Sequence, residues 1–172
     1  MKDDNRYKIL MGALEKNAKL NATIDEEGLS MRFLNYPRRK EHQIPWGLDN
    51  IQGALKMRAI LETNLWKGGT ELGGMLLEKV LEPLLFEKAR QNQLNKPIFI
   101  SIITDGEPDY EDHGRTLKEV IEDCKQRLRE QYPHYGENAV AFHITQIGNS
   151  PAASNFLDDL AQDPVVGNFI YC

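Results

Sequence analysis

The chain has 172 residues, enough for one domain with a substantial hydrophobic core. Its 41% apolar and 27% charged residues are typical of a globular protein and exclude a disordered chain. The net charge of −5, from 21 basic and 26 acidic residues, argues against nucleic acid as a partner, because phosphate binding needs a concentrated basic surface. The densest basic cluster, YPRRKEH at 36–42, is short and has acidic neighbours, so we expect a solvated loop there.

Membrane insertion and secretion are not expected either. No apolar run approaches the roughly 20 residues that a membrane-spanning helix needs. The polar start MKDDNRYKIL lacks the apolar stretch of a signal peptide. Cys124 and Cys172 have no metal-type spacing, and Cys124 falls on the apolar face of a predicted helix, where a buried thiol is expected. We therefore expect a chain with no membrane partner in a reducing, cytoplasmic compartment.

The N-terminal part predicts a helix, a strand and a second helix. Apolar side chains recur with helical spacing over residues 6–20, at Tyr7, Leu10, Met11, Leu14 and Ala18. The segment LSMRFLN at 29–35 alternates apolar and polar residues, as a strand does. Asp49 with Gln52 three residues later resembles a capping box, which predicts a helix over about 50–62.

A glycine-containing loop and a long apolar segment follow. The spacing predicts a helix from about 70 to 90, which Pro83 should kink or interrupt. The segment KPIFISIIT at 96–104 is a nearly continuous, isoleucine-rich apolar run. Such a run indicates a strand that is buried on both faces, as in a parallel sheet.

The rest of the chain continues the alternation of helices and strands. Helical spacing returns over 114–131, and a strand is predicted at 138–148. A last helix should begin with Ser150 as its N-cap and Pro151 at its first position. This order predicts an α/β fold with a mostly parallel central sheet that helices flank on both faces.

Two motifs lie where such a sheet would bind a ligand. Ligands of open α/β sheets bind beyond the carboxyl ends of the strands. Asp105 closes the strand predicted at 96–104, and Thr70 lies in the loop that enters the next helix. Their hard oxygen atoms suit Mg²⁺ or Mn²⁺, which keep several waters and leave a position for a partner's carboxylate. Taken separately, the motifs have ordinary interpretations: a glycine C-cap with a threonine N-cap, and an Asp-Gly turn.

The sequence GGT-x-LG before a helix and ITDG after an apolar strand resembles the von Willebrand factor type A (vWA) family, in particular its stand-alone members in fungi and other eukaryotes. The resemblance covers nearly the whole chain and implies a Rossmann-like fold with a metal-ion-dependent adhesion site (MIDAS) built from three loops. Thr70 and Asp105 match the second and third loops, which implies that they are the metal ligands. The neighbouring residues expected to contact an unidentified protein partner are Gly68, Gly69, Glu71, Gly106 and Glu107.

The first loop of that site, an Asp-x-Ser-x-Ser motif after the first strand, has no counterpart in the sequence. The resemblance therefore implies a single, N-terminally incomplete vWA-like domain over 1–172, without the central first strand. Its absence would leave two facing rows of unpaired backbone groups and would make any Mg²⁺ or Mn²⁺ site incomplete. Whether Met1 is the true start of the protein stays open.

These features together predict a non-enzymatic protein-binding module that uses the edge carrying Thr70 and Asp105. One alternative is a degenerate, metal-free scaffold or an incomplete gene product. The other is a phosphate- or nucleotide-binding α/β enzyme, because GGTELGG before a helix offers backbone amides to a phosphate. That loop lacks the Lys-Ser/Thr of a P-loop and the spacing of a dinucleotide site. No Ser/His/Asp or Cys/His catalytic arrangement is evident in the sequence.

Overall fold

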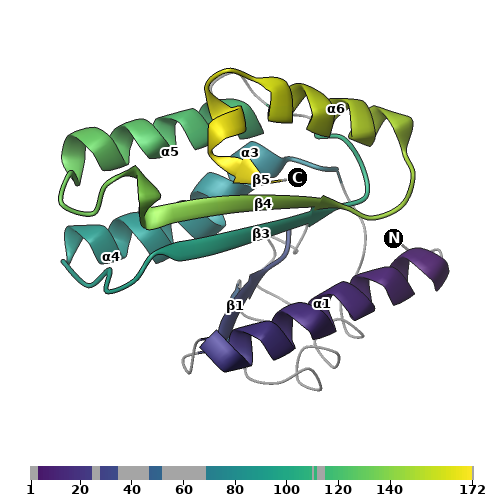
Figure 1. Cartoon of the computed structure of the whole chain (residues 1–172), viewed down its shortest axis with the longest axis horizontal. Helices are drawn as coiled ribbons and strands as arrows, with labels where there is room; N and C mark the ends of the chain where they lie inside the picture. Colours follow the sequence, from purple (N-terminus) through teal and green to yellow (C-terminus); the bar gives the residue numbers. More distant parts are fainter. Residues whose placement is uncertain are drawn as a thin grey trace, which may run out of the picture. The chain divides into compact units, whose positions relative to one another are not determined.

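A computed structural model describes residues 4–24, 28–34, 47–51, 69–109, 111 and 115–171. The chain divides into two compact units, Met1–Gly68 and Gly69–Cys172. The described elements form a mixed α/β structure of helices and two separate sheets, one of two antiparallel strands and one of three parallel strands (Figure 1). The basic cluster at 36–42, Gly68 and most of the helix predicted over 50–62 lie outside the described residues.

The first unit packs one helix against a strand pair. It contains α1 (Asp4–Ile24), β1 (Leu29–Arg32) and β2 (Gly47–Ile51). Its apolar core is formed by buried Met11, Ala18, Met31 and Ile51, with Tyr7, Leu14, Leu29 and Phe33 partly buried around them. The helical spacing read from the sequence is thus the spacing that buries one face of α1, and the first helix and strand are confirmed.

The helix start predicted at Asp49 is wrong. Asp49 lies within β2, which pairs antiparallel with β1. The carboxylate of Asp49 forms an ion pair with the guanidinium of Arg32 at 2.8 Å. An Asp followed by a Gln three residues later matches a local capping pattern, but pairing with a strand distant in sequence determines the backbone here. The acidic side chain therefore stabilises a strand pair instead of a helix terminus.

The second unit consists of helices alternating with a three-stranded parallel sheet. Its elements in chain order are α3 (Leu72–Leu76), η1 (Leu77–Phe86), α4 (Glu87–Arg90), β3 (Ile98–Thr104), α5 (Leu117–Gln131), η2 (Glu137–Ala139), β4 (Val140–Gln146), α6 (Pro151–Gln162), η3 (Val166–Asn168) and β5 (Ile170–Tyr171). The strand order is β3-β4-β5, and β3 pairs with β4 in one unbroken register from Ile98 opposite Val140 to Thr104 opposite Gln146. The predicted strands at 96–104 and 138–148 are confirmed within two residues at each end.

The helix predicted over 70–90 continues through its proline. Between α3 and α4 the backbone adopts the wider π-helical form, η1, which contains Pro83. Proline has no N–H and its ring clashes with the carbonyl four residues earlier in an α-helix, so a wider turn accommodates it. The guanidinium of Arg127 on α5 lies 3.7 Å from the ring centre of Phe86 and forms an ion pair with the carboxylate of Glu82 at 2.8 Å. Both partners are on η1, so these contacts stabilise the packing of η1 against α5.

Side-chain caps begin the two later helices. Ser150 accepts a hydrogen bond from the N–H of Ala153, and Pro151 occupies the first turn, as predicted. Thr116 and Glu119 form a reciprocal capping box at the start of α5, a signal that is present in the sequence as TLKE but was missed. Both caps fix the point at which the chain leaves a loop and enters a helix.

The two faces of the three-stranded sheet differ in burial. One face carries the buried Phe142 and Ile144, and α5 reaches it through Lys125, whose ammonium donates to the Val140 carbonyl at 2.6 Å. On the other face, Phe99 is 66% exposed and Tyr171 is 64% exposed. The expectation that the strand at 96–104 is buried on both faces is therefore wrong, because the helices that the structure describes in this unit cover one face of the sheet and leave Phe99 on the other face exposed (Figure 1).

Candidate functional site

The turn that follows β3 is held in place by a buried threonine. Thr104 is 2% exposed, and its hydroxyl donates to the carbonyl of Gly106 at 2.9 Å and accepts from the N–H of Gly106 at 3.3 Å. The Thr104 carbonyl accepts from the N–H of Ile147 at 2.7 Å, which joins the ends of β3 and β4. These bonds position Asp105 at the carboxyl edge of the sheet, as predicted.

Thr70 is joined to the same loop by two reciprocal hydrogen bonds. Its backbone N–H donates to the carboxylate of Asp109, and its carbonyl accepts from the N–H of Asp109 at 3.1 Å. Thr70 and Asp109 are 39 residues apart in the chain. The segment before α3 and the segment after β3, each carrying one predicted site residue, therefore lie side by side.

A second carboxylate in this loop connects two helix N-termini. Glu111 accepts a hydrogen bond from the N–H of Gly73 at 2.9 Å, near the start of α3, and from the N–H of Leu117 at 3.2 Å, the first residue of α5. The first N–H groups of a helix have no partner within it, and a negative charge is favourable there. A side chain at Gly73 would place its Cβ 1.9 Å from the Arg115 carbonyl, so this approach requires glycine.

The surroundings of Glu111 oppose its negative charge. Burial is the main influence and raises its pKa above the usual value, while the hydrogen bonds from Gly73 and Leu117 lower it in part. The negative charges of Glu119 and Glu71 raise the pKa further. This carboxylate is thus a structural group at the centre of an acidic region.

The other predicted site residues lie in these two segments. Gly69 and Glu71 flank Thr70 and are half-buried, whereas Glu107 is exposed beyond Gly106. The N-cap of α3 is Glu71, with no side-chain cap of its own, so the interpretation of Thr70 as the capping residue is wrong.

Asp109 and Glu111 were missed as connecting residues. They belong to the acidic stretch EPDYEDH, whose composition is typical of a solvated loop, yet both carboxylates accept backbone N–H groups. For Glu111 alone, the sequence offers a signal: an acidic residue shortly before a capped helix, where the helix dipole favours a negative charge.

The described residues do not make a complete cation site. Within the ranges that the structure covers, no group of three or more His, Cys, Asp or Glu side chains is arranged to hold a metal ion. Thr70 and Asp105 offer one hydroxyl and one carboxylate, so water would have to supply most of the coordination of a Mg²⁺ or Mn²⁺ ion. The donor set therefore fits such an ion only in part.

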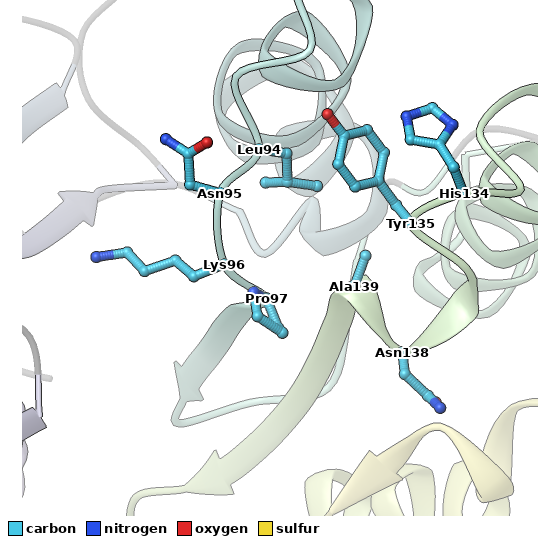
Figure 2. A pocket seen from close by; sticks show the side chains of 8 residues that line it. All are labelled: Leu94, Asn95, Lys96, Pro97, His134, Tyr135, Asn138 and Ala139. Atoms are coloured by element: carbon cyan, nitrogen blue, oxygen red, sulfur yellow. The ribbon is translucent and has the colours of Figure 1, made fainter.

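A shallow pocket lies at the opposite end of the sheet, where β3 and β4 begin. It has a volume of about 260 Å³. In Figure 2 the side chains of Leu94 and Tyr135 face one another, whereas Lys96 and Asn138 point away. Ligand pockets usually enclose ~300–1,000 Å³ and converge polar groups on the ligand. The carboxyl edge of the sheet, where hydrogen bonds join the loops before α3 and after β3, is the better candidate site.

Comparisons with protein-family models, with curated proteins and with solved structures give no match to this chain. In the part of the chain that the structure describes, no helix is both long enough and apolar enough to cross a membrane.

Proposed function

We propose that the chain is a non-enzymatic protein-binding module of the vWA type, which engages its partner at the carboxyl edge of the parallel sheet. The observation that carries this proposal is the pair of hydrogen bonds between Thr70 and Asp109. They bring together the two segments that hold Thr70 and Asp105, the residues matching two loops of the family site. The exposed Glu107 and the half-buried Glu71 beside them give the edge a negative character that suits a partner with basic or metal-bridged groups.

The division of the strands supports the same proposal. A vWA-like chain without its central first strand would be left with two groups of strands, one on each side of the gap. The described strands do form two separate sheets, β1-β2 and β3-β4-β5, and the second is parallel as the family requires. From this division of the described strands we infer a Rossmann-like vWA domain.

In this proposal Thr70 and Asp105 hold one Mg²⁺ or Mn²⁺ ion weakly, and the ion provides a positive charge to which a carboxylate of the partner can bind. A second candidate function, a metal-free scaffold, is favoured by the absence of a three-ligand group among the described residues. A phosphate-binding enzyme is less well supported, because the amides of Thr70 and Gly73 already bind carboxylates that would repel a phosphate.

Thermal unfolding of the purified 172-residue chain, with and without millimolar Mg²⁺ or Mn²⁺, tests the proposal. A ligand that binds only the folded state stabilises it, by ~2.7 kcal/mol at a hundredfold excess over its dissociation constant. We expect a metal-dependent rise in Tm that is lost in Asp105→Ala. The matched control is Asp158→Ala, which removes an exposed carboxylate on α6 and should keep the rise. A cooperative transition indifferent to both metals would favour the metal-free scaffold.

A further inference from the structure

The segment that follows α6 lies along β4 and is joined to it by a short strand pairing. Asp163 is the C-cap of α6, and residues 163–171, which we call the strap, form η3 and β5. In the described ranges β5 pairs with β4 through two residues, Ile170 and Tyr171, whereas β3 pairs with β4 through seven (Figure 1). Val166 and Ile170 are buried and supply apolar packing. Backbone pairing therefore contributes little to holding the strap in place.

Side-chain contacts with α5 also hold the strap. The ammonium of Lys118 forms an ion pair with the carboxylate of Asp163 at 2.7 Å, and the Lys118 side chain is 47% exposed. Ion pairs that reach water contribute little to stability, because solvent screens them. The ammonium of Lys125 lies 4.8 Å from the ring centre of Phe169. Because Lys125 is buried, this is the contact on which closure of the strap should depend.

Lys125 is a buried cation without a paired carboxylate in the described part of the chain. It is 4% exposed, and its ammonium donates to the carbonyls of Val140 at 2.6 Å and Glu137 at 2.8 Å. The ring centres of Phe169 and Phe142 lie 4.8 and 5.7 Å from the same nitrogen. An ammonium near an aromatic face is attracted by the ring. Of these partners, Phe169 belongs to the strap.

Closing the strap removes water from this charge. An ion that is buried without a counter-ion keeps a desolvation penalty, which carbonyls and rings offset only in part. Burial accordingly lowers the pKa of Lys125, an effect that the charges of Cys124 and Glu137 oppose in part. Opening the strap would let water reach the ammonium, so this penalty reduces the free energy that opening requires.

We propose that the strap opens as a unit while the rest of the parallel sheet stays folded, and that the contact between Lys125 and Phe169 sets how often it opens. Local opening of this kind is expected where few contacts hold a segment. In the open state β4 presents backbone N–H and C=O groups on the side that β5 covers at Phe142 and His143. The amine of Lys125 becomes accessible in the same state. The strap thus controls access to one strand edge and to one lysine.

Acylation of lysine amines in the full chain, followed by peptide mapping, tests the opening. The reagent is N-hydroxysuccinimidyl acetate, and the rate at Lys125 is measured at fixed pH in increasing urea. Global unfolding, followed by circular dichroism, depends steeply on urea because it exposes much surface, whereas a local opening exposes little. We expect a rate at Lys125 that is insensitive to low urea and slower than the rate at Lys118. A rate at Lys125 that rises in step with global unfolding at every urea concentration overturns the proposal, and so does a rate equal to that of Lys118.

Two matched variants test the role of Phe169. Phe169→Leu keeps an apolar side chain but removes the ring near the ammonium, and Tyr171→Leu removes an exposed ring from the same strap. We expect acylation of Lys125 to be about tenfold faster in Phe169→Leu and unchanged in Tyr171→Leu. Equal rates in the two variants contradict the proposed contact. If Phe169→Leu does not fold, the urea dependence of the wild-type rate still decides whether the strap opens locally.

Discussion

Replacing Glu111 by alanine should loosen the start of two helices at once. The carboxylate is the hydrogen-bond acceptor for the N–H of Gly73 at 2.9 Å and for the N–H of Leu117 at 3.2 Å. Loss of a helix-capping acceptor usually reduces stability by about 0.5–2 kcal/mol. The site is half-buried, so water can replace part of each bond, and we expect a combined loss of about 1–3 kcal/mol. For a chain of this size, that loss lowers Tm by about 3–10 °C.

The assay is chemical and thermal unfolding of Glu111→Ala beside Glu111→Gln and Glu107→Ala. Glutamine retains one acceptor oxygen, so its stability should lie between those of the wild type and the alanine variant. Glu107 is exposed in the same loop and should change stability by less than ~0.5 kcal/mol. If Glu111→Ala were as stable as Glu107→Ala, the connection between the two helix starts would not contribute to stability, and our account of this loop would be wrong.

The raised pKa of Glu111 adds a pH dependence with a definite sign. Between its unfolded pKa, about 4.3, and its higher folded pKa, the folded state binds the proton more tightly than the unfolded state. The contribution of Glu111 to stability should therefore be present below pH ~4.3 and decline as the pH rises through that window. Glu111→Gln cannot ionise, so the stability difference between it and the wild type should change across that window.

Three further outcomes follow from single residues. Gly73→Ala should destabilise the chain by several kcal/mol (~2–5) in a denaturant titration, because its Cβ would overlap the Arg115 carbonyl. Burial raises the pKa of the Cys124 thiol to about 12, so peptide mapping should find it unlabelled by a thiol reagent at pH 8 until the chain unfolds. The hydrogen bond from Lys118 lowers the pKa of Asp163 to about 2, so Asp163→Asn should have a lower Tm than the wild type at pH 7, and this gap should close as the pH falls from 3.8 to 2.

Features that depend on local pattern were predictable from the sequence. The apolar spacing of α1, the two apolar strands and the Ser150–Pro151 helix start are confirmed, because each depends on residues close together in the chain. The capping pattern at Asp49 failed because β2 pairs with a strand nearly twenty residues away. The prediction that β3 is buried on both faces failed at Phe99, because the burial of a strand residue depends on which face of the sheet the helices cover.

For the candidate site, too, local features were predictable and contacts between distant parts of the chain were not. The position of Asp105 at the end of a strand could be predicted, because a buried apolar run that stops at a polar residue indicates the edge of a sheet. The connecting role of Asp109 could not, because it depends on a contact across 39 residues of chain. An acidic stretch has the same local appearance whether it is solvated or bound to helix N-termini.

The central claim, that the segments carrying Thr70 and Asp105 form one cation-assisted binding edge, is tested most directly by titrating the ¹⁵N-labelled chain with Mn²⁺. Paramagnetic broadening should appear first at the amides of 69–71 and 105–109, disappear in Asp105→Ala and persist in Asp158→Ala. Broadening confined to other surface carboxylates, or broadening at this edge that Asp105→Ala leaves unchanged, would contradict the account.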